Sequence, residues 1–159
     1  MSVEELTAGH VMSRVLVAIK PDESPLMAWE LMRRAGVHHL PVVAGQHVLG
    51  ILTREDLAAS WSGGPQEQSG RQVRDLLGRD ARPRVGPDTT LPRVAALMLD
   101  SDRDAVPVVS RGALVGLITA RDVLSVVAGR GQARDEPGEV VTGMFHLEPV
   151  LPTRSWREA

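Results

Sequence analysis

The sequence predicts an α+β fold made of two tandem β-α-β-β-α repeats. The first observation is a duplication: "HLPVV" and "GILTREDL" (39–43, 50–57) return as "AVPVV" and "GLITARDV" (105–109, 116–123). The second is its length: residues 21–56 align with residues 87–122 without a gap, at an offset of 66, and 10 of these 36 pairs are identical. Since two copies are too few for a solenoid, we expect a pseudo-symmetric pair.

The first repeat shows a regular alternation of apolar runs and turn residues. Residues 15–19 ("VLVAI") predict a short strand. Residues 21–36 predict a helix, with Ser24 as its N-cap and Pro25 in its first turn. Its apolar residues recur at helical spacing and share one face. A tight turn ("AGQH") then separates two strands, 40–44 and 47–52, and a second helix begins at "TREDLAAS".

The second repeat follows the same order with a weaker start. Only "PRV" (83–85) corresponds to the first strand, and Thr90 takes the place of Ser24 as the cap of the following helix. The later elements are strands at 106–110 and 113–118 and a helix beginning at "TARDVLSVVA".

Segment composition sets the expected domain limits. A segment rich in Gly, Ser and Gln (61–71) reads as a linker between repeats at 8–60 and 72–130. Residues 131–159 contain three prolines and no clear hydrophobic period, which predicts an irregular tail.

Composition narrows the classes of function. The chain has 159 residues, 43% hydrophobic and 24% charged, which is the balance of a globular protein. A net charge of −2 and 3% aromatic residues argue against a nucleic-acid partner. The absence of cysteine excludes disulfides and cysteine-ligated zinc. No signal-like start and no apolar run near the ~20 residues of a membrane helix are present, so we expect a soluble, cytoplasmic protein with no membrane partner.

A Thr-x-x-Asp motif stands where a strand meets a helix in both repeats, at Thr53/Asp56 and Thr119/Asp122. One interpretation is a capping box, in which the aspartate bonds back to the N–H of the capping threonine. The other is a ligand site, in which the carboxylate binds the vicinal hydroxyls of a ribose. The motif alone favours the capping box, because capping is common.

The context of the motif changes this balance. The element order, the "PVV" strand, the Gly-h-h-Thr-x-x-Asp junction (h, apolar) and the 66-residue duplication together resemble the CBS-domain pair, or Bateman module, over most of the chain. The resemblance implies two repeats packed about a pseudo-twofold axis, with clefts for an adenosyl ligand such as AMP, ADP, ATP or S-adenosylmethionine. It also implies a flat homodimer that regulates an unidentified partner protein and is not itself an enzyme.

The resemblance also implies the residues of the clefts. In this family the aspartate holds the ribose, the threonine helps to hold phosphate, and the adenine lies against the strand around "PVV". The expected nucleotide-binding residues are therefore Thr53, Asp56, Thr119, Asp122, His38, His39, Leu40, Pro41, Ala105, Val106 and Pro107.

The copies differ just before "PVV", where the first has His38-His39 and the second has Asp104-Ala105. A histidine there would reach phosphate across the cleft, or it would lie partly solvated at the start of the strand. We expect the better phosphate site beside Asp122, facing the two histidines. Three further cations are expected near the clefts: Arg82, Arg84 and Arg103.

Catalysis and metal binding have little support. No histidine has a partner at metal-ligand spacing, and no serine stands in a Gly-x-Ser-x-Gly motif. The lead hypothesis is a ligand sensor, and the alternative is a dimeric interaction scaffold with vestigial clefts. A homodimer is expected through the helices at 24–36 and 90–100, which are apolar over more of their circumference than one sheet face needs.

Overall fold

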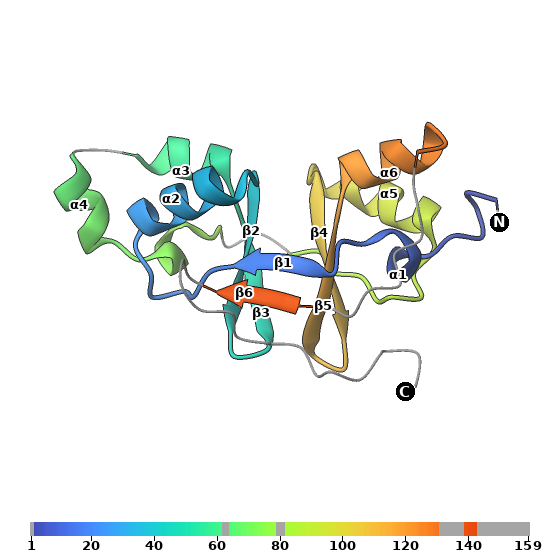
Figure 1. Cartoon of the computed structure of the whole chain (residues 1–159), viewed down its shortest axis with the longest axis horizontal. Helices are drawn as coiled ribbons and strands as arrows, with labels where there is room; N and C mark the ends of the chain where they lie inside the picture. The colour runs from blue at the N-terminus through green and yellow to red at the C-terminus, as the bar shows by residue number, and fades with distance from the viewer. Residues whose placement is uncertain (1, 62–63, 79–81, 131–138, 143–159) are drawn as a thin grey trace.

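Two β-hairpins stand side by side in the computed structural model, which describes all residues except 1, 62–63, 79–81, 131–138 and 143–159 (Figure 1). Helices cover one end of the hairpins, and the hairpin turns form the other end. The first half consists of α1 (Ala8–Val11), β1 (Val15–Ala18), α2 (Pro25–Ala35), β2 (His39–Ala44), β3 (His47–Thr53) and α3 (Arg54–Ser60). The second consists of α4 (Pro65–Gly70), the 3-10 helix η1 (Val73–Leu76), α5 (Leu91–Ser101), β4 (Ala105–Ser110), β5 (Ala113–Thr119), α6 (Ala120–Val127) and β6 (Glu139–Thr142).

The two hairpins have the same register. Pro41 pairs with Ile51 and Pro107 pairs with Leu117. The register shifts between Val42 and Val43 in the first hairpin, and at the equivalent place, between Val108 and Val109, in the second. A proline has no N–H for the ladder, but its carbonyl still accepts. Pro41 accepts from the N–H of Ile19 at 2.9 Å, and Pro107 accepts from that of Val85 at 3.1 Å. The duplicated α+β fold is therefore confirmed.

The helix that follows the first strand is capped at both ends in the first repeat. The Ser24 side chain accepts from the N–H of Met27 at 3.1 Å, as predicted, and Gly36 ends α2 with a left-handed φ of 66°. In the second repeat Thr90 holds the N-cap position of α5 without a side-chain hydrogen bond. Asp102 takes the left-handed position there, at φ 52°.

The start of each repeat packs on the other repeat. Ala8 and Met12, at the start of the first repeat, are buried with Val94 and Ile118 of the second. Val73, at the start of the second repeat, is buried with the core residues of the first. A third cluster joins the halves, and its residues are Leu16, Ala18, Val43, Ala105, Leu114 and Leu117. The chain thus crosses between the repeats twice, in residues 12–19 (the first crossing) and in residues 73–85 (the second crossing), and this fixes one repeat against the other.

Two predicted segments differ from the structure. The linker predicted at 61–71 contains the short helix α4, which starts at Pro65 and packs against α2. This helix has no counterpart in the predicted β-α-β-β-α order, and the other elements keep that order. The tail predicted to be irregular contains β6, which pairs in parallel with β1 from Val15↔Glu139 to Ala18↔Thr142. Its four residues, "EVVT", are too few to show a period, but valine and threonine favour a strand once an edge is offered. The rest of the tail lies outside the described residues.

The weak strand predicted at 83–85 is reduced to one bridge, Val85↔Val108, which repeats the bridge Ile19↔Val42 at the same offset of 66. This bridge aligns the chain on either side of it. Residues 82–84 of the second crossing therefore correspond to residues 16–18 in β1. Within the described part of the chain, no helix is long and apolar enough to span a bilayer.

Candidate functional site

Both Thr-x-x-Asp motifs form capping boxes. The Asp56 N–H donates to Thr53 Oγ1 at 3.1 Å, and the Thr53 N–H donates to Asp56 Oδ2 at 3.0 Å. At the start of α6, Asp122 Oδ2 accepts from the Thr119 N–H at 2.8 Å and from its hydroxyl at 2.9 Å. The capping interpretation is confirmed. It does not exhaust the carboxylates, because each box uses Oδ2 and leaves Oδ1 without a hydrogen bond to the described residues.

Asp56 lines a pocket that lies between the two repeats and has a volume of about 240 Å³. This is slightly below the ~300 Å³ at which small-molecule sites usually begin, and the pocket is partly open to solvent. Its apolar wall comes mainly from β3, the end of η1 and β4, and consists of Val48, Leu49, Gly50, Ile51, Leu76, Leu77, Gly78, Pro83, Ala105 and Pro107. The pocket therefore presents an apolar surface beside the carboxylate of Asp56.

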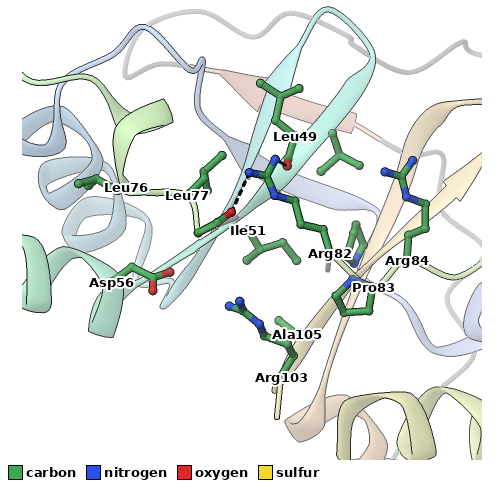
Figure 2. A pocket seen from close by; sticks show the side chains of 14 residues that line it. Leu49, Ile51, Asp56, Leu76, Leu77, Arg82, Pro83, Arg84, Arg103 and Ala105 are labelled. Carbon is green, nitrogen blue, oxygen red and sulfur yellow. Dashed lines mark hydrogen bonds between the residues drawn. The ribbon is translucent and has the colours of Figure 1, made fainter. Parts of the chain in front are cut away.

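Three arginines complete the lining: Arg82, Arg84 and Arg103. Figure 2 shows that they reach the pocket from the second crossing and from the loop before β4, with the Asp56 carboxylate on the opposite side. Three positive charges and one negative charge give the lining a net charge of +2, although the whole chain carries −2.

The arginines differ in what already holds them. Arg82 donates to the backbone carbonyls of Leu49 and Gly78, the latter at 2.9 Å (Figure 2). The side chains of Arg84 and Arg103 have no hydrogen bond or ion pair with any residue that the structure describes. Two guanidinium cations beside a pocket are thus available to a ligand.

The glycine before each Thr-x-x-Asp motif leaves room for side chains from one of the two crossings: Met12 of the first crossing lies against Gly116, and Leu77 and Arg82 of the second lie against Gly50. At Gly116 an added Cβ would lie 2.3 Å from Met12 Sδ and 3.1 Å from Met12 Cβ. At Gly50 it would lie 3.3 Å from a methyl group of Leu77 and 3.6 Å from Cδ of Arg82. The close approach that glycine permits is used here by the protein's own side chains, and at Gly50 these side chains belong to the pocket.

The predicted site residues divide into separate groups. Asp56, Ala105 and Pro107 lie together in the pocket, while Thr53 caps α3 beside it. The other predicted residues do not line this pocket: Leu40, Pro41 and Val106 are buried in strands, and Thr119 and Asp122 lie at the start of α6.

The two histidines do not line this pocket either. His39 Nε2 lies 3.0 Å from Oδ1 of Asp104, and His38 is exposed, with its carbonyl accepting from the Arg54 N–H at 3.2 Å. The expectation of a better phosphate site beside Asp122, facing these histidines, stays a prediction. On the Asp56 side three arginines gather around the pocket.

The apolar wall was not identified from the sequence. We expected the adenine to lie against the strand around "PVV", whereas much of the wall comes from β3, the strand that leads into Thr53, and from η1. The "HVLGIL" run directly before the motif is the signal that could have indicated it. Among the described residues no group of three or more His, Asp or Glu side chains is placed to hold a metal ion.

Two α+β repeats share a buried cluster and line one pocket, so the chain is a tandem-repeat protein in which the two repeats pack as one domain. Residues 8–63 and 73–129 each match the sequence pattern of the CBS domain. The chain therefore belongs to the CBS-domain family and has the fold of a CBS-domain pair.

Relatives show the same tandem in other settings. The inosine-5'-monophosphate dehydrogenase of Korarchaeum cryptofilum is 33% identical over 131 residues, which cover 82% of this chain and 26% of that enzyme. The chain spans about a quarter of the length of the curated relatives it matches. These matches therefore do not show that the chain shares the activity of those enzymes.

Solved structures share the fold. The CBS-domain pair of protein MJ0100, in complex with 5'-methylthioadenosine and S-adenosyl-L-methionine, matches with a TM-score of 0.67 at 21% identity, over 78% of this chain and 97% of that one. The CBS domain of a bacterial CNNM/CorC family Mg²⁺ transporter, in complex with ATP, matches with a TM-score of 0.69 at 21% identity, over 80% and 90%.

Proposed function

We propose that this chain is a regulatory module that binds an adenosyl ligand in the pocket between its repeats and thereby changes its contact with a partner protein. The observation that carries the proposal is the pocket itself. It combines the Asp56 carboxylate, an apolar wall, and the guanidinium groups of Arg84 and Arg103. The Oδ1 atom of Asp56 and both guanidinium groups have no hydrogen-bond partner among the residues that the structure describes.

Each part of an adenosine nucleotide has a counterpart in this lining. The Oδ1 atom of Asp56 is an acceptor for ribose hydroxyls, and the aliphatic side chains of Leu49, Ile51 and Leu77 offer a surface for a flat base. The arginines suit phosphate oxygens, because the guanidinium group matches them with paired donors. The adenosyl ligands bound by protein MJ0100 and by the CNNM/CorC transporter domain support the same ligand class here.

A position between the repeats gives binding a means of regulation. The pocket takes Asp56 from one repeat and Ala105 from the other, so a ligand that contacts both favours one relative placement of the halves. A partner that reads this placement would respond to the ligand. In this proposal residues 8–60 and 72–130 act as the two halves of one sensor.

A second candidate function, the dimeric scaffold, is favoured by a different observation. Leu99 of α5 is 82% exposed, and Leu124 and Val127 of α6 are 67% and 66% exposed. These helices lie next to each other at one end of the molecule (Figure 1), and such side chains are a suitable surface for a second copy of the chain. We include a homodimer through the helices in the proposal, since sensing and dimerisation are compatible.

Thermal melting with AMP, ADP, ATP and S-adenosylmethionine separates sensor from scaffold. A ligand present at 100 times its Kd stabilises the folded state by about 2.7 kcal/mol, which is readily measured. The sensor proposal expects such a shift with at least one of the four compounds. Guanosine is the control and should cause no shift. If none of the four adenosyl compounds raises the melting temperature, the sensor proposal is wrong and the scaffold is favoured.

A further inference from the structure

The clearest asymmetry between the repeats is in the charge of three equivalent positions. Arg82, Arg84 and Arg103 line the Asp56 pocket. At the offset of 66 their counterparts on the Asp122 side are Leu16, Ala18 and Val37. The matching bridges at Ile19 and Val85 show that the two crossings are aligned in space as well as in sequence.

Two of the three counterpart positions are also closed to a ligand's charged group. Leu16 and Ala18 are 3% and 0% exposed and belong to the apolar cluster that joins the repeats. They lie in β1, whose backbone is paired with β6, whereas residues 82–84 form no strand. Leu16, Ala18 and Val37 offer an anion no charge, and placing one against buried aliphatic groups is costly. Two basic residues near them are already bonded within the protein. Arg14, in the first crossing, is 8% exposed and donates to the carbonyl of Gly9 at 3.2 Å, and His39, the counterpart of Ala105, is bonded to Asp104.

We infer that the two sides divide their ligands by charge: the Asp56 pocket binds a nucleoside polyphosphate, and the Asp122 side does not. This inference rests on the proposed function for the adenosyl part of the ligand. The chain then binds one polyphosphate nucleotide, although its fold is duplicated.

The number and spread of the cations favour a polyphosphate over a single phosphate. Figure 2 shows the side chains of Arg82, Arg84 and Arg103 ending at separate places around the pocket, an arrangement that suits several phosphoryl groups better than one. The lining also carries a net charge of +2 with the Asp56 carboxylate already counted. Affinity therefore rises from adenosine to AMP, ADP and ATP, and it falls with ionic strength for the charged ligands only.

Isothermal titration calorimetry of adenosine, AMP, ADP, ATP and inorganic tripolyphosphate, without divalent cations, tests this inference. ATP should bind once per chain and at least about tenfold more tightly than adenosine. Arg84→Gln and Arg103→Gln should each lower ATP affinity by about tenfold and leave adenosine affinity unchanged. Arg93→Gln is the matched control, because Arg93 is an exposed arginine of α5 outside the pocket.

Each other outcome overturns a defined statement. Equal affinity for adenosine and ATP, or ATP binding that neither substitution weakens, overturns the charge division and leaves the adenosyl proposal standing. Arginine-dependent binding of tripolyphosphate with no effect of any adenosine compound supports the anion site and overturns the adenosyl proposal. No binding of any of the five compounds overturns both. Two ATP molecules per chain would contradict the assignment to one side.

Discussion

The Nε2 atom of His39 lies 3.0 Å from Oδ1 of Asp104, and this contact joins the two repeats across 65 residues of sequence. The His39 side chain is 16% exposed and that of Asp104 is 69% exposed. Asp104 directly follows Arg103 of the pocket and directly precedes Ala105, which also lines it. The bond therefore lies beside the Asp56 pocket and links the two repeats there.

The strength of this bond can be measured with a double-mutant cycle. For a pair so open to water on one side, we expect a coupling of about 0.2–1 kcal/mol between His39→Ala and Asp104→Ala in urea unfolding. His38→Ala with Asp104→Ala is the control, because His38 is exposed and makes no side-chain bond to Asp104. Equal coupling in both cycles would show that the contact is not specific.

The two motif glycines should differ in how well they tolerate a side chain. Gly116→Ala places a methyl group against both Sδ and Cβ of Met12, and the main-chain end of that residue cannot move away, so we expect a loss of about 1–3 kcal/mol. Gly50→Ala meets only the ends of Leu77 and Arg82 and should cost less than about 1 kcal/mol. Thermal unfolding of both variants checks the order, and Gly116→Ala should cost less in a Met12→Ala background, which lacks the Sδ atom, than in the wild type. A larger loss at Gly50 would contradict the packing described.

The exposed aliphatic side chains of α5 and α6 predict the dimer surface. Leu124→Asp removes an apolar contact worth about 1.5–3 kcal/mol at each copy of the interface and adds a charge, so the dimer should dissociate. Light scattering after size-exclusion chromatography measures the mass directly. Val3→Asp serves as the control, since Val3 is an exposed apolar residue outside these helices. A wild-type chain that is monomeric, or a Leu124→Asp variant that stays dimeric, would place the interface elsewhere or exclude it.

Local features of the fold could be predicted from the sequence because their causes are local. The Ser24 cap, the two hairpins and the Thr-x-x-Asp capping boxes each depend on residues within a few positions of one another. The duplication then supplied the global arrangement, since two copies with one pattern adopt one register.

Long-range contacts could not be predicted in the same way. The sequence showed that His39 and Asp104 differ between the copies, but it could not show that they bind each other. It also named the three arginines without indicating that all of them line the Asp56 pocket. Strand β6 was missed because its formation depends on the open edge of β1, more than 120 residues earlier.

The two capping boxes provide a matched pair of variants for the central claim. Asp56→Ala and Asp122→Ala both remove a bond to the threonine N–H, and Asp122→Ala also removes the bond from the Thr119 hydroxyl, so each should lose about 1 kcal/mol of folding stability and Asp122→Ala slightly more. Only Asp56 lines the arginine-rich pocket. Any difference between the variants in nucleotide binding therefore reports the pocket and not the helix cap.

Calorimetric titration of ATP into these two variants is the most direct test that Asp56 holds the ribose of a nucleotide. Hydrogen bonds to an ionised carboxylate are worth about 1.5–3 kcal/mol, so Asp56→Ala should weaken ATP binding by at least about tenfold. Asp122→Ala should keep the wild-type ATP affinity. If Asp56→Ala melts at a lower temperature but binds ATP as tightly as the wild type, the carboxylate is only a helix cap and the proposed site is wrong.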